Sequence, residues 1–256
     1  MMVNGSIAGQ ASVSAERAGS EDCAVAVIES PELPALEPYI RPPEQTAGAL
    51  PCLRSTPLVV ALDLESVLVP EIWETVSRTT GVSRLAFTTR DIADYGALML
   101  ERMRLCREHR LTLPRLREIV GAMQPLPGAI EFLAWVQQRM LAVIVSDTFH
   151  ELAGPVVEKL GCPLMICNSL VLDEQDYISS HRAHHGLGKA GAVAHFQHLG
   201  FQVIAVGDSY NDVSMLQTAN AGILFRPCPG LVERADGLPS VWSLQQLQSE
   251  LSVTGL

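Results

Sequence analysis

Four clusters of polar residues each follow a short apolar run of the sequence, and together they supply five carboxylates. The clusters are Asp63-Leu64-Glu65, Ser146-Asp147-Thr148, Asn168-Ser169 and Gly207-Asp208-Ser209-Tyr210-Asn211-Asp212. Taken singly, the acids and hydroxyls of any one cluster could simply cap the next helix. If all four converge, the carboxylates repel one another unless a cation lies among them, and oxygen ligands of this kind suit Mg2+. The sequence therefore predicts a magnesium site, provided that the fold brings the clusters together.

The apolar runs that precede these clusters show no alternation of apolar and polar residues. This is typical of strands in a parallel sheet that is covered on both faces. The runs lie at 58–62, 141–145, 164–166, 203–206 and 223–225, and helix-like segments lie at 130–139, 151–160, 190–199 and 213–219. Alternating strands and helices predict a doubly wound α/β sheet. Ligands of such a sheet bind beyond the carboxyl ends of its strands, which is where the polar clusters would meet.

The long stretch between the first two strands contains only helix-like segments, at 71–80, 95–109 and 114–122. We expect residues 71–125 to form a small helical cap inserted after the first strand, and residues 57–70 and 126–256 to form the α/β core. Residues 1–56 are rich in Pro, Ala, Ser and Glu and contain no Phe or Trp. Such a segment buries too little apolar surface to offset the entropy of ordering it. We predict a disordered N-terminal extension there, with too many early acidic residues for a targeting peptide.

Composition narrows the classes of partner. The 256 residues carry a formal net charge of −10, so no global basic field attracts nucleic acid or an anionic membrane. No run approaches the roughly 18 apolar residues that span a bilayer. The six cysteines are scattered without a Cys-x-x-Cys pair, which predicts free thiols in a reducing cytoplasm. A small-molecule ligand fits these features best, and the sequence leaves the oligomeric state open.

The order of the motifs resembles a known family. Asp63-Leu64-Glu65, Ser146, Lys189 and Gly207-Asp208-Ser209-x-x-Asp212 resemble the four motifs of the haloacid dehalogenase-like phosphatases. The strings LDLESVLVPEIW, TTRDIADY, VSDTF and GDSYND…AGILF are similar to the bifunctional phosphoserine phosphatase / homoserine phosphotransferase family within it. The similarity covers residues 59–245. It implies an enzyme that hydrolyses O-phospho-L-serine to L-serine and phosphate with Mg2+, and that can also transfer the phosphoryl group to L-homoserine.

Each catalytic role implied by the resemblance falls on one residue of this sequence. Asp63 would be the nucleophile that forms an aspartyl phosphate, and Glu65 would be the general acid and then the general base. Mg2+ would be held by Asp63, by the backbone carbonyl of Glu65 and by Asp208, with Asp212 supporting these ligands. The phosphoryl oxygens would be bound by Ser146, by the backbone at Asp147 and by Lys189.

The resemblance also implies how the substrate is chosen. Glu71 would bind the ammonium group of phosphoserine and Arg102, on a cap helix, would bind its carboxylate. Asn211 would add a polar contact. One departure from the family pattern is Ser66, which stands directly after Glu65 where the family has glycine. A serine side chain there is expected to crowd the loop.

Three other interpretations stay open. The same chemistry could act on another small phosphate monoester, a phosphoacceptor signalling domain also uses carboxylates with Ser/Thr and Lys, and a silent binding protein could keep the fold. The helical insertion and the Asp-x-Glu motif argue against the signalling domain, and the complete set of motif residues argues against the silent protein.

The histidines at 181, 184 and 185 cluster in a segment that reads as a loop, and no Cys or acidic partner completes a zinc site there.

Overall fold

The computed structural model describes residues 57–256 except 89–90, 93, 184–187, 236 and 255–256. The predicted disordered extension at 1–56 lies outside the described residues. So do two of the clustered histidines, His184 and His185.

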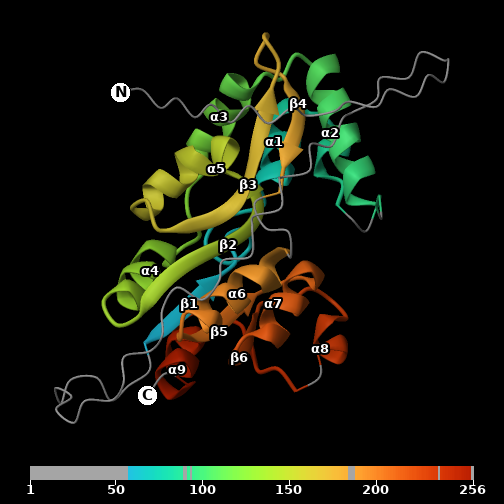
Figure 1. Ribbon diagram of the computed structural model, residues 1–256. Coiled ribbons are helices and arrows are strands. Elements are labelled where there is room, and N and C mark those ends of the chain that lie inside the picture. The colour runs from blue at the N-terminus through green and yellow to red at the C-terminus, as the bar shows by residue number, and fades with distance from the viewer. Residues whose placement is uncertain (1–56, 89–90, 93, 184–187, 236, 255–256) are drawn as a thin grey trace, which may run out of the picture.

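The described chain is built on one seven-stranded sheet with the strand order β4-β3-β2-β1-β5-β6-β7 (Figure 1). All neighbouring strands run parallel except β4, which pairs antiparallel with β3. The strands are β1 (Leu58–Leu62), β2 (Leu141–Phe149), β3 (Met165–Leu172), β4 (Ile178–Arg182), β5 (Gln202–Gly207), β6 (Ala221–Phe225) and β7 (Ser240–Val241). This mostly parallel sheet confirms the predicted α/β fold.

Helices cover both faces of the sheet. They are α1 (Ile72–Thr80), α2 (Tyr95–Glu108), α3 (Leu113–Ala122), α4 (Ala129–Gln137), α5 (His150–Val157), α6 (Gly188–His198), α7 (Val213–Thr218), α8 (Leu231–Arg234) and α9 (Leu244–Thr254). Val60 and Leu62 of β1 belong to a large core cluster with α4, α5 and α9, whereas Val59 and Ala61 belong to a second cluster with α6 and α7. Since successive side chains of a strand point to opposite faces, a strand buried on both sides must be apolar throughout.

The first three helices all lie between β1 and β2 in the chain, as predicted from the sequence. Helix α1 ends at Gly81, which adopts the left-handed conformation with φ 76°. The side chain of Asp94 caps α2 by accepting a hydrogen bond from Ala97 N at 2.7 Å. Apolar residues of α1 and α3 belong to the same large core cluster as α4 and α5. The three helices are therefore packed onto the sheet domain by continuous apolar contact.

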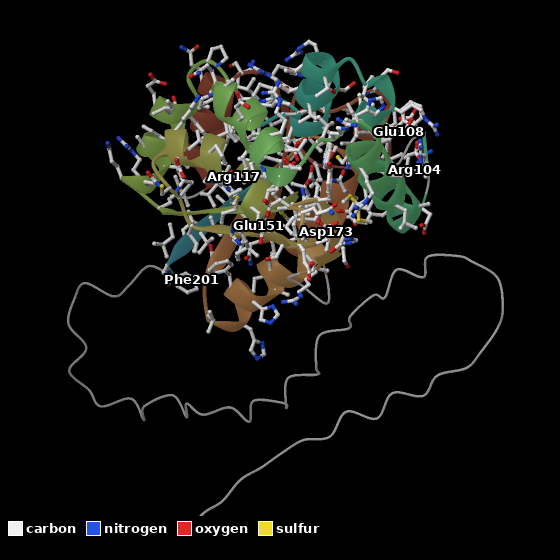
Figure 2. The ribbon with its side chains drawn as sticks, turned by 90° about the horizontal axis from the view of Figure 1, so that it is seen from above. Arg104, Glu108, Arg117, Glu151, Asp173 and Phe201 are labelled. Atoms are coloured by element: carbon white, nitrogen blue, oxygen red, sulfur yellow. The ribbon has the colours of Figure 1, made fainter. Side chains whose placement is uncertain are left out.

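Polar contacts reinforce this attachment. Arg117 of α3 donates to the Glu151 carbonyl of α5 at 2.5 Å, and Glu151 in turn accepts from Leu170 N of β3 at 2.7 Å. Arg107 of α2 forms an ion pair with Asp173. Asp173 follows β3 and is labelled in Figure 2. The helices inserted after β1 are thus tied to both α5 and the β3–β4 hairpin.

The sequence prediction was wrong for strand β4 and for the end of strand β3. His181, predicted in a loop, lies in β4, where its ring packs edge-on against Tyr95 of α2 and Phe149. Asn168 and Ser169, predicted to follow a strand, lie inside the longer β3. Strand β4 has the sequence ISSHR and its burial is mostly partial, so it lacks the apolar run by which the other strands were found.

In the described part of the chain, no helix is both long and apolar enough to cross a membrane.

Candidate active site

The polar ends of β1, β2 and β5 meet at one edge of the sheet, around the side chain of Lys189. Asp63 directly follows β1, and its backbone N–H continues the ladder by donating to Val206 O at 2.9 Å. Asp208 directly follows β5, and Ser146 and Asp147 lie near the end of β2. The parallel register places these three ends side by side, as the sequence predicted.

Lys189 is the buried cation of this site. It stands in the first turn of α6, and its Nζ lies 2.8 Å from Asp63 Oδ1, 2.7 Å from Asp212 Oδ1 and 3.6 Å from Asp147 Oδ2. Burial alone would lower the pKa of Lys189, but the three carboxylates outweigh burial and raise the pKa well above its ordinary value. Lys189 therefore carries a permanent positive charge beside the Asp63 carboxylate.

Both carboxylate oxygens of Asp212 form hydrogen bonds to neighbouring residues. One of its oxygens bonds Lys189, and the other accepts from Asp208 N at 3.1 Å and Ser209 N at 3.0 Å. A Cβ on Gly207 would lie only 2.4 Å from the Cβ of Asp212, so this position requires glycine. The sequence analysis included Gly207 in the fourth motif but gave it no role, although a glycine at the end of a buried strand is a known sign of such close approach.

Three carboxylates of the site form a group that could hold a cation. Ligand atoms of Asp63, Asp208 and Asp212 all lie within 4.8 Å of one another. Burial and the neighbouring Asp212 raise the pKa of Asp63 well above its usual range, against the opposing effect of Lys189. Burial, Asp212 and Glu71 raise the pKa of Asp208 to about 7. Carboxylates that resist ionisation for lack of positive charge fit a hard divalent cation such as Mg2+. Because both oxygens of Asp212 are already used, Asp63 and Asp208 are the side chains best placed to ligate it.

Glu65 faces the start of α1. Its Oε1 accepts a hydrogen bond from Ile72 N at 2.7 Å, so this carboxylate satisfies one of the free N–H groups of the helix. Burial and the nearby Glu71 raise the pKa of Glu65 to about 7, although the Ile72 N–H, Arg102 and Lys189 oppose this shift. A carboxyl group with a pKa near neutrality can both donate and accept a proton under ordinary conditions.

Arg102 is a buried cation that forms no ion pair among the described residues. Only 9% of the residue is exposed, its Nη2 donates to Phe87 O at 2.8 Å, and its guanidinium lies 4.8 Å from the centre of the Trp73 ring. Its Nε has no hydrogen-bond partner, and Arg102 forms no ion pair with any described residue. Burial lowers the pKa of Arg102, and the nearby Tyr95, Glu65 and Glu71 oppose this shift. Buried arginines are normally paired, so Arg102 is a candidate to bind an anionic ligand.

The remaining predicted residues lie around Asp147. Asn211 Nδ2 donates to Asp147 Oδ2 at 3.1 Å, and Asn168 Nδ2 donates to Asp147 O at 2.9 Å. The buried Ser146 hydroxyl accepts from Thr148 N at 3.2 Å. Glu71 is exposed and stands at the N-cap position, directly before α1, where its side chain makes no capping hydrogen bond. The structure therefore brings every predicted residue to the same region, but it gives Asn211 a partner within the protein.

The raised pKa values of Glu65 and Asp208 predict how stability depends on pH and Mg2+. A carboxyl whose folded-state pKa is raised from about 4 to about 7 binds its proton more tightly when folded, so stability falls as pH rises through this window. Mg2+ binds the ionised form and should restore the loss. We expect the Mg2+-induced rise in Tm to be larger at about pH 8 than at about pH 5.5. Differential scanning fluorimetry measures this, and Asp208→Asn should abolish the difference. An equal rise at both pH values contradicts the prediction.

Comparison with known proteins agrees with this architecture. The chain belongs to the haloacid dehalogenase-like hydrolase family, whose sequence pattern it matches over residues 64–217.

Among proteins of this family, the chain is 41% identical to phosphoserine phosphatase ThrH of Pseudomonas aeruginosa over 192 residues, which cover 75% of the chain and 94% of the relative. It is also 41% identical over 192 residues to a phosphoserine phosphatase of Pseudomonas syringae pv. tomato, covering 75% of the chain and 81% of the relative. A solved structure described as a phospho-aspartyl intermediate analogue of phosphoserine phosphatase is similar in fold. Its TM-score is 0.63 at 20% identity, over 77% of this chain and 99% of the other.

Proposed function

We propose that this protein is a cytoplasmic, Mg2+-dependent phosphoserine phosphatase of amino-acid metabolism that works through an aspartyl phosphate. One observation carries the choice of substrate: the buried guanidinium of Arg102, which forms no ion pair with any described residue, lies near Glu65 and Glu71, beside the cluster of carboxylates around Lys189. A substrate with a phosphate, a carboxylate and an ammonium group would find a complementary charge for each. The names of the relatives, at 41% identity, support the same substrate.

The proposed reaction starts at Asp63. The carboxylate oxygen that is not bonded to Lys189 attacks phosphorus, and the bond between phosphorus and the serine oxygen breaks. Glu65 gives its proton to that oxygen, so serine leaves as the neutral alcohol. Glu65 then removes a proton from water, which attacks phosphorus and returns Asp63 as a free carboxylate. A pKa of about 7 suits Glu65 to both steps.

The surrounding residues would bind the phosphoryl group and the cation. Lys189 neutralises charge on the phosphoryl oxygens, while the Ser146 hydroxyl and the backbone at Asp147 donate hydrogen bonds to them. Asp63, the Glu65 backbone carbonyl and Asp208 would hold Mg2+, with Asp212 fixing both Lys189 and the Asp208 backbone. Bound Mg2+ would supply positive charge that lets the anionic nucleophile and the anionic phosphate approach each other.

The amino-acid part of the substrate would lie between Glu71 and Arg102. Glu71 offers a carboxylate for the ammonium group, and Arg102 offers a planar guanidinium that can bond a carboxylate with two N–H groups. Asn211 would contribute from the opposite side, through the Asp147 carboxylate that it holds. The same site could pass the phosphoryl group to L-homoserine, because homoserine has the same two charged groups and a hydroxyl that can replace water.

Product analysis tests this proposal. The protein is incubated with O-phospho-L-serine and Mg2+, with and without excess L-homoserine, and serine, phosphate and phosphohomoserine are measured. Serine and phosphate without homoserine would support the phosphatase, and phosphohomoserine in its presence would support the transferase as well. If phosphoserine is not cleaved but a generic phosphate ester is, the substrate is instead another small phosphate monoester.

Replacing Arg102 should weaken activity only toward substrates with a carboxylate. Loss of a buried charge partner costs at least about 2 kcal/mol, or about 30-fold in rate. We therefore expect Arg102→Met to lower kcat/KM for phosphoserine by about 30-fold or more, and that for phosphoethanolamine, which lacks the carboxylate, by less than about threefold. Arg104→Met is the matched control, because Arg104 lies on the same helix but is exposed and paired with Glu101 and Glu108. Equal losses on both substrates would show that Arg102 has no role in recognition.

A further inference from the structure

Ser66 has a backbone conformation that serine rarely adopts. Its φ is +61°, in the left-handed region, where a residue other than glycine costs about 1 kcal/mol or more. Backbone hydrogen bonds of the surrounding loop hold Ser66 in this conformation. Ser66 N donates to Val69 O at 2.7 Å, and Leu68 N donates to Leu64 O at 2.9 Å, which closes a tight loop between β1 and α1.

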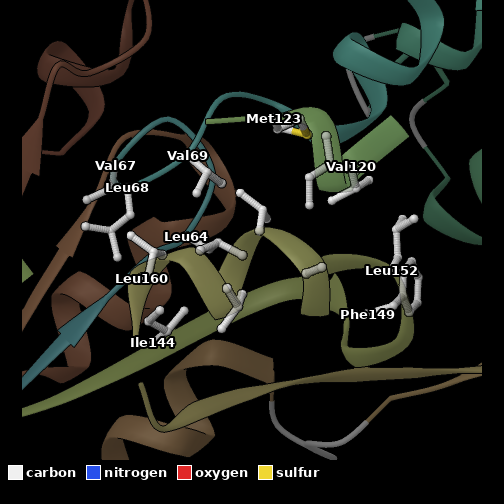
Figure 3. Packing of buried hydrophobic residues seen from close by; sticks show 14 of the residues in the cluster. Leu64, Val67, Leu68, Val69, Val120, Met123, Ile144, Phe149, Leu152 and Leu160 are labelled. Atoms are coloured by element: carbon white, nitrogen blue, oxygen red, sulfur yellow. The ribbon is translucent and has the colours of Figure 1, made fainter. Parts of the chain in front are cut away.

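The loop is anchored in the hydrophobic core by its own apolar side chains. Leu64, Val67, Leu68 and Val69 are all completely buried in the large core cluster, together with residues such as Val120 and Met123 (Figure 3). This packing fixes the backbone of the loop. The unfavourable conformation of Ser66 is thus imposed by the core, and glycine would adopt it with less strain.

The Ser66 hydroxyl has a partner at the site. Ser66 Oγ donates to Glu71 Oε1 at 2.8 Å. Glu71 is otherwise exposed and forms no ion pair with a described residue. A free glutamate side chain has many rotamers, and fixing one costs entropy when a ligand binds. The bond from Ser66 holds one oxygen of Glu71 in place and leaves the other available.

We propose that Ser66 is a positioning residue that orients the Glu71 carboxylate toward the ammonium group of the substrate. This inference rests on the proposed function, because it assigns to Glu71 the binding of an ammonium group. It explains why a hydroxyl is present at a strained position: the rigid loop carries the donor, and the donor pre-orders a carboxylate that would otherwise be free to move. Selection of amino-bearing phosphate esters is the property that should depend on Ser66.

Two substrates separate this role from a general effect on the loop. Phosphoethanolamine has the ammonium group without the carboxylate, and the phosphate ester of β-hydroxypropionate has the carboxylate without the ammonium group. The readout is the ratio of kcat/KM for the first substrate to that for the second. A hydrogen bond to a charged group contributes less at an exposed site than in the interior, so Ser66→Ala should lower this ratio about five- to tenfold.

Ser66→Gly provides a second measurement, because it removes the hydroxyl and also the backbone strain. It should lower the ratio as much as Ser66→Ala while raising Tm relative to Ser66→Ala. Glu71→Gln should lower the ratio at least as far as either variant. Ser249→Ala, which removes a hydroxyl that bonds Gln245 O on α9, is the control and should leave the ratio unchanged.

The possible failures are distinguishable. If Glu71→Gln lowers the ratio and neither Ser66 variant does, the inference about Ser66 is wrong and the proposed function stands. If both Ser66 variants slow the two substrates equally, Ser66 serves only the loop, and the inference is again overturned. If the wild-type protein cleaves phosphoserine no better than esters without charged groups and Glu71→Gln has no selective effect, the proposed function itself fails.

Discussion

Asp63→Asn should reduce turnover of phosphoserine by at least about 10⁴-fold, because the amide cannot form the covalent phosphoryl intermediate. The variant should not lose stability. The Asp63 carboxylate is buried, and burial and the neighbouring Asp212 raise its pKa well above the usual range, so its negative charge disfavours the folded state relative to a neutral side chain. An isosteric neutral side chain removes this cost while Asp212 continues to pair with Lys189. We therefore expect an unchanged or higher Tm together with loss of activity.

The covalent step can be observed directly. Acid quenching of the wild-type protein during turnover of radiolabelled phosphoserine should trap label on the protein, and Asp63→Asn should trap none. Asp176→Asn makes the same chemical change on the exposed hairpin between β3 and β4, far along the chain from the site, and should behave as wild type. Label retained by Asp63→Asn would assign the nucleophile to another residue.

Lys189→Met should have the second largest effect, on both stability and activity. The substitution keeps most of the side-chain volume but leaves Asp63, Asp212 and Asp147 without their shared cation. Breaking a buried ion pair on one side costs about 3–5 kcal/mol. The pKa of Lys189 is raised in the folded state, so its contribution is fully present at neutral pH and is lost only at strongly alkaline pH. We expect a loss of about 3–5 kcal/mol in the free energy of unfolding without Mg2+, measured by urea titration at neutral pH.

Mg2+ distinguishes a loss of charge from a loss of packing. Because the uncompensated carboxylates of Lys189→Met can be neutralised by a divalent cation, saturating Mg2+ should recover a large part of the lost stability but not the activity. The control is the chain's other lysine. Lys159 donates to the backbone carbonyls of Gly121 and Met123, so Lys159→Met should destabilise the protein without Mg2+-dependent recovery. Equal recovery in both variants would show that Lys189 has no special relation to the carboxylates.

The position of the carboxylates could be predicted because it follows from topology. Asp63 and Asp208 directly follow buried strands, and neighbouring parallel strands end at the same edge of the sheet. Asn168 shows the limit of this reasoning. The apolar pattern ended β3 too early, and Asn168 instead reaches Asp147 from inside the strand. The edge strand β4 had no apolar run, because most of its side chains are only partly buried.

Hydrophobic patterning and motif spacing predict the doubly wound α/β architecture and the meeting of the polar clusters, and the resemblance of the motifs to a known family predicts the chemistry of the site. The partners of each side chain depend instead on the packing of the whole fold. The position of Arg102 above Trp73 without an ion pair to any described residue, the use of both Asp212 oxygens, the requirement for glycine at 207 and the bond from Ser66 to Glu71 all depend on short-range contacts. Distances on this scale are set by how helices and loops pack, and no pattern along the chain encodes them.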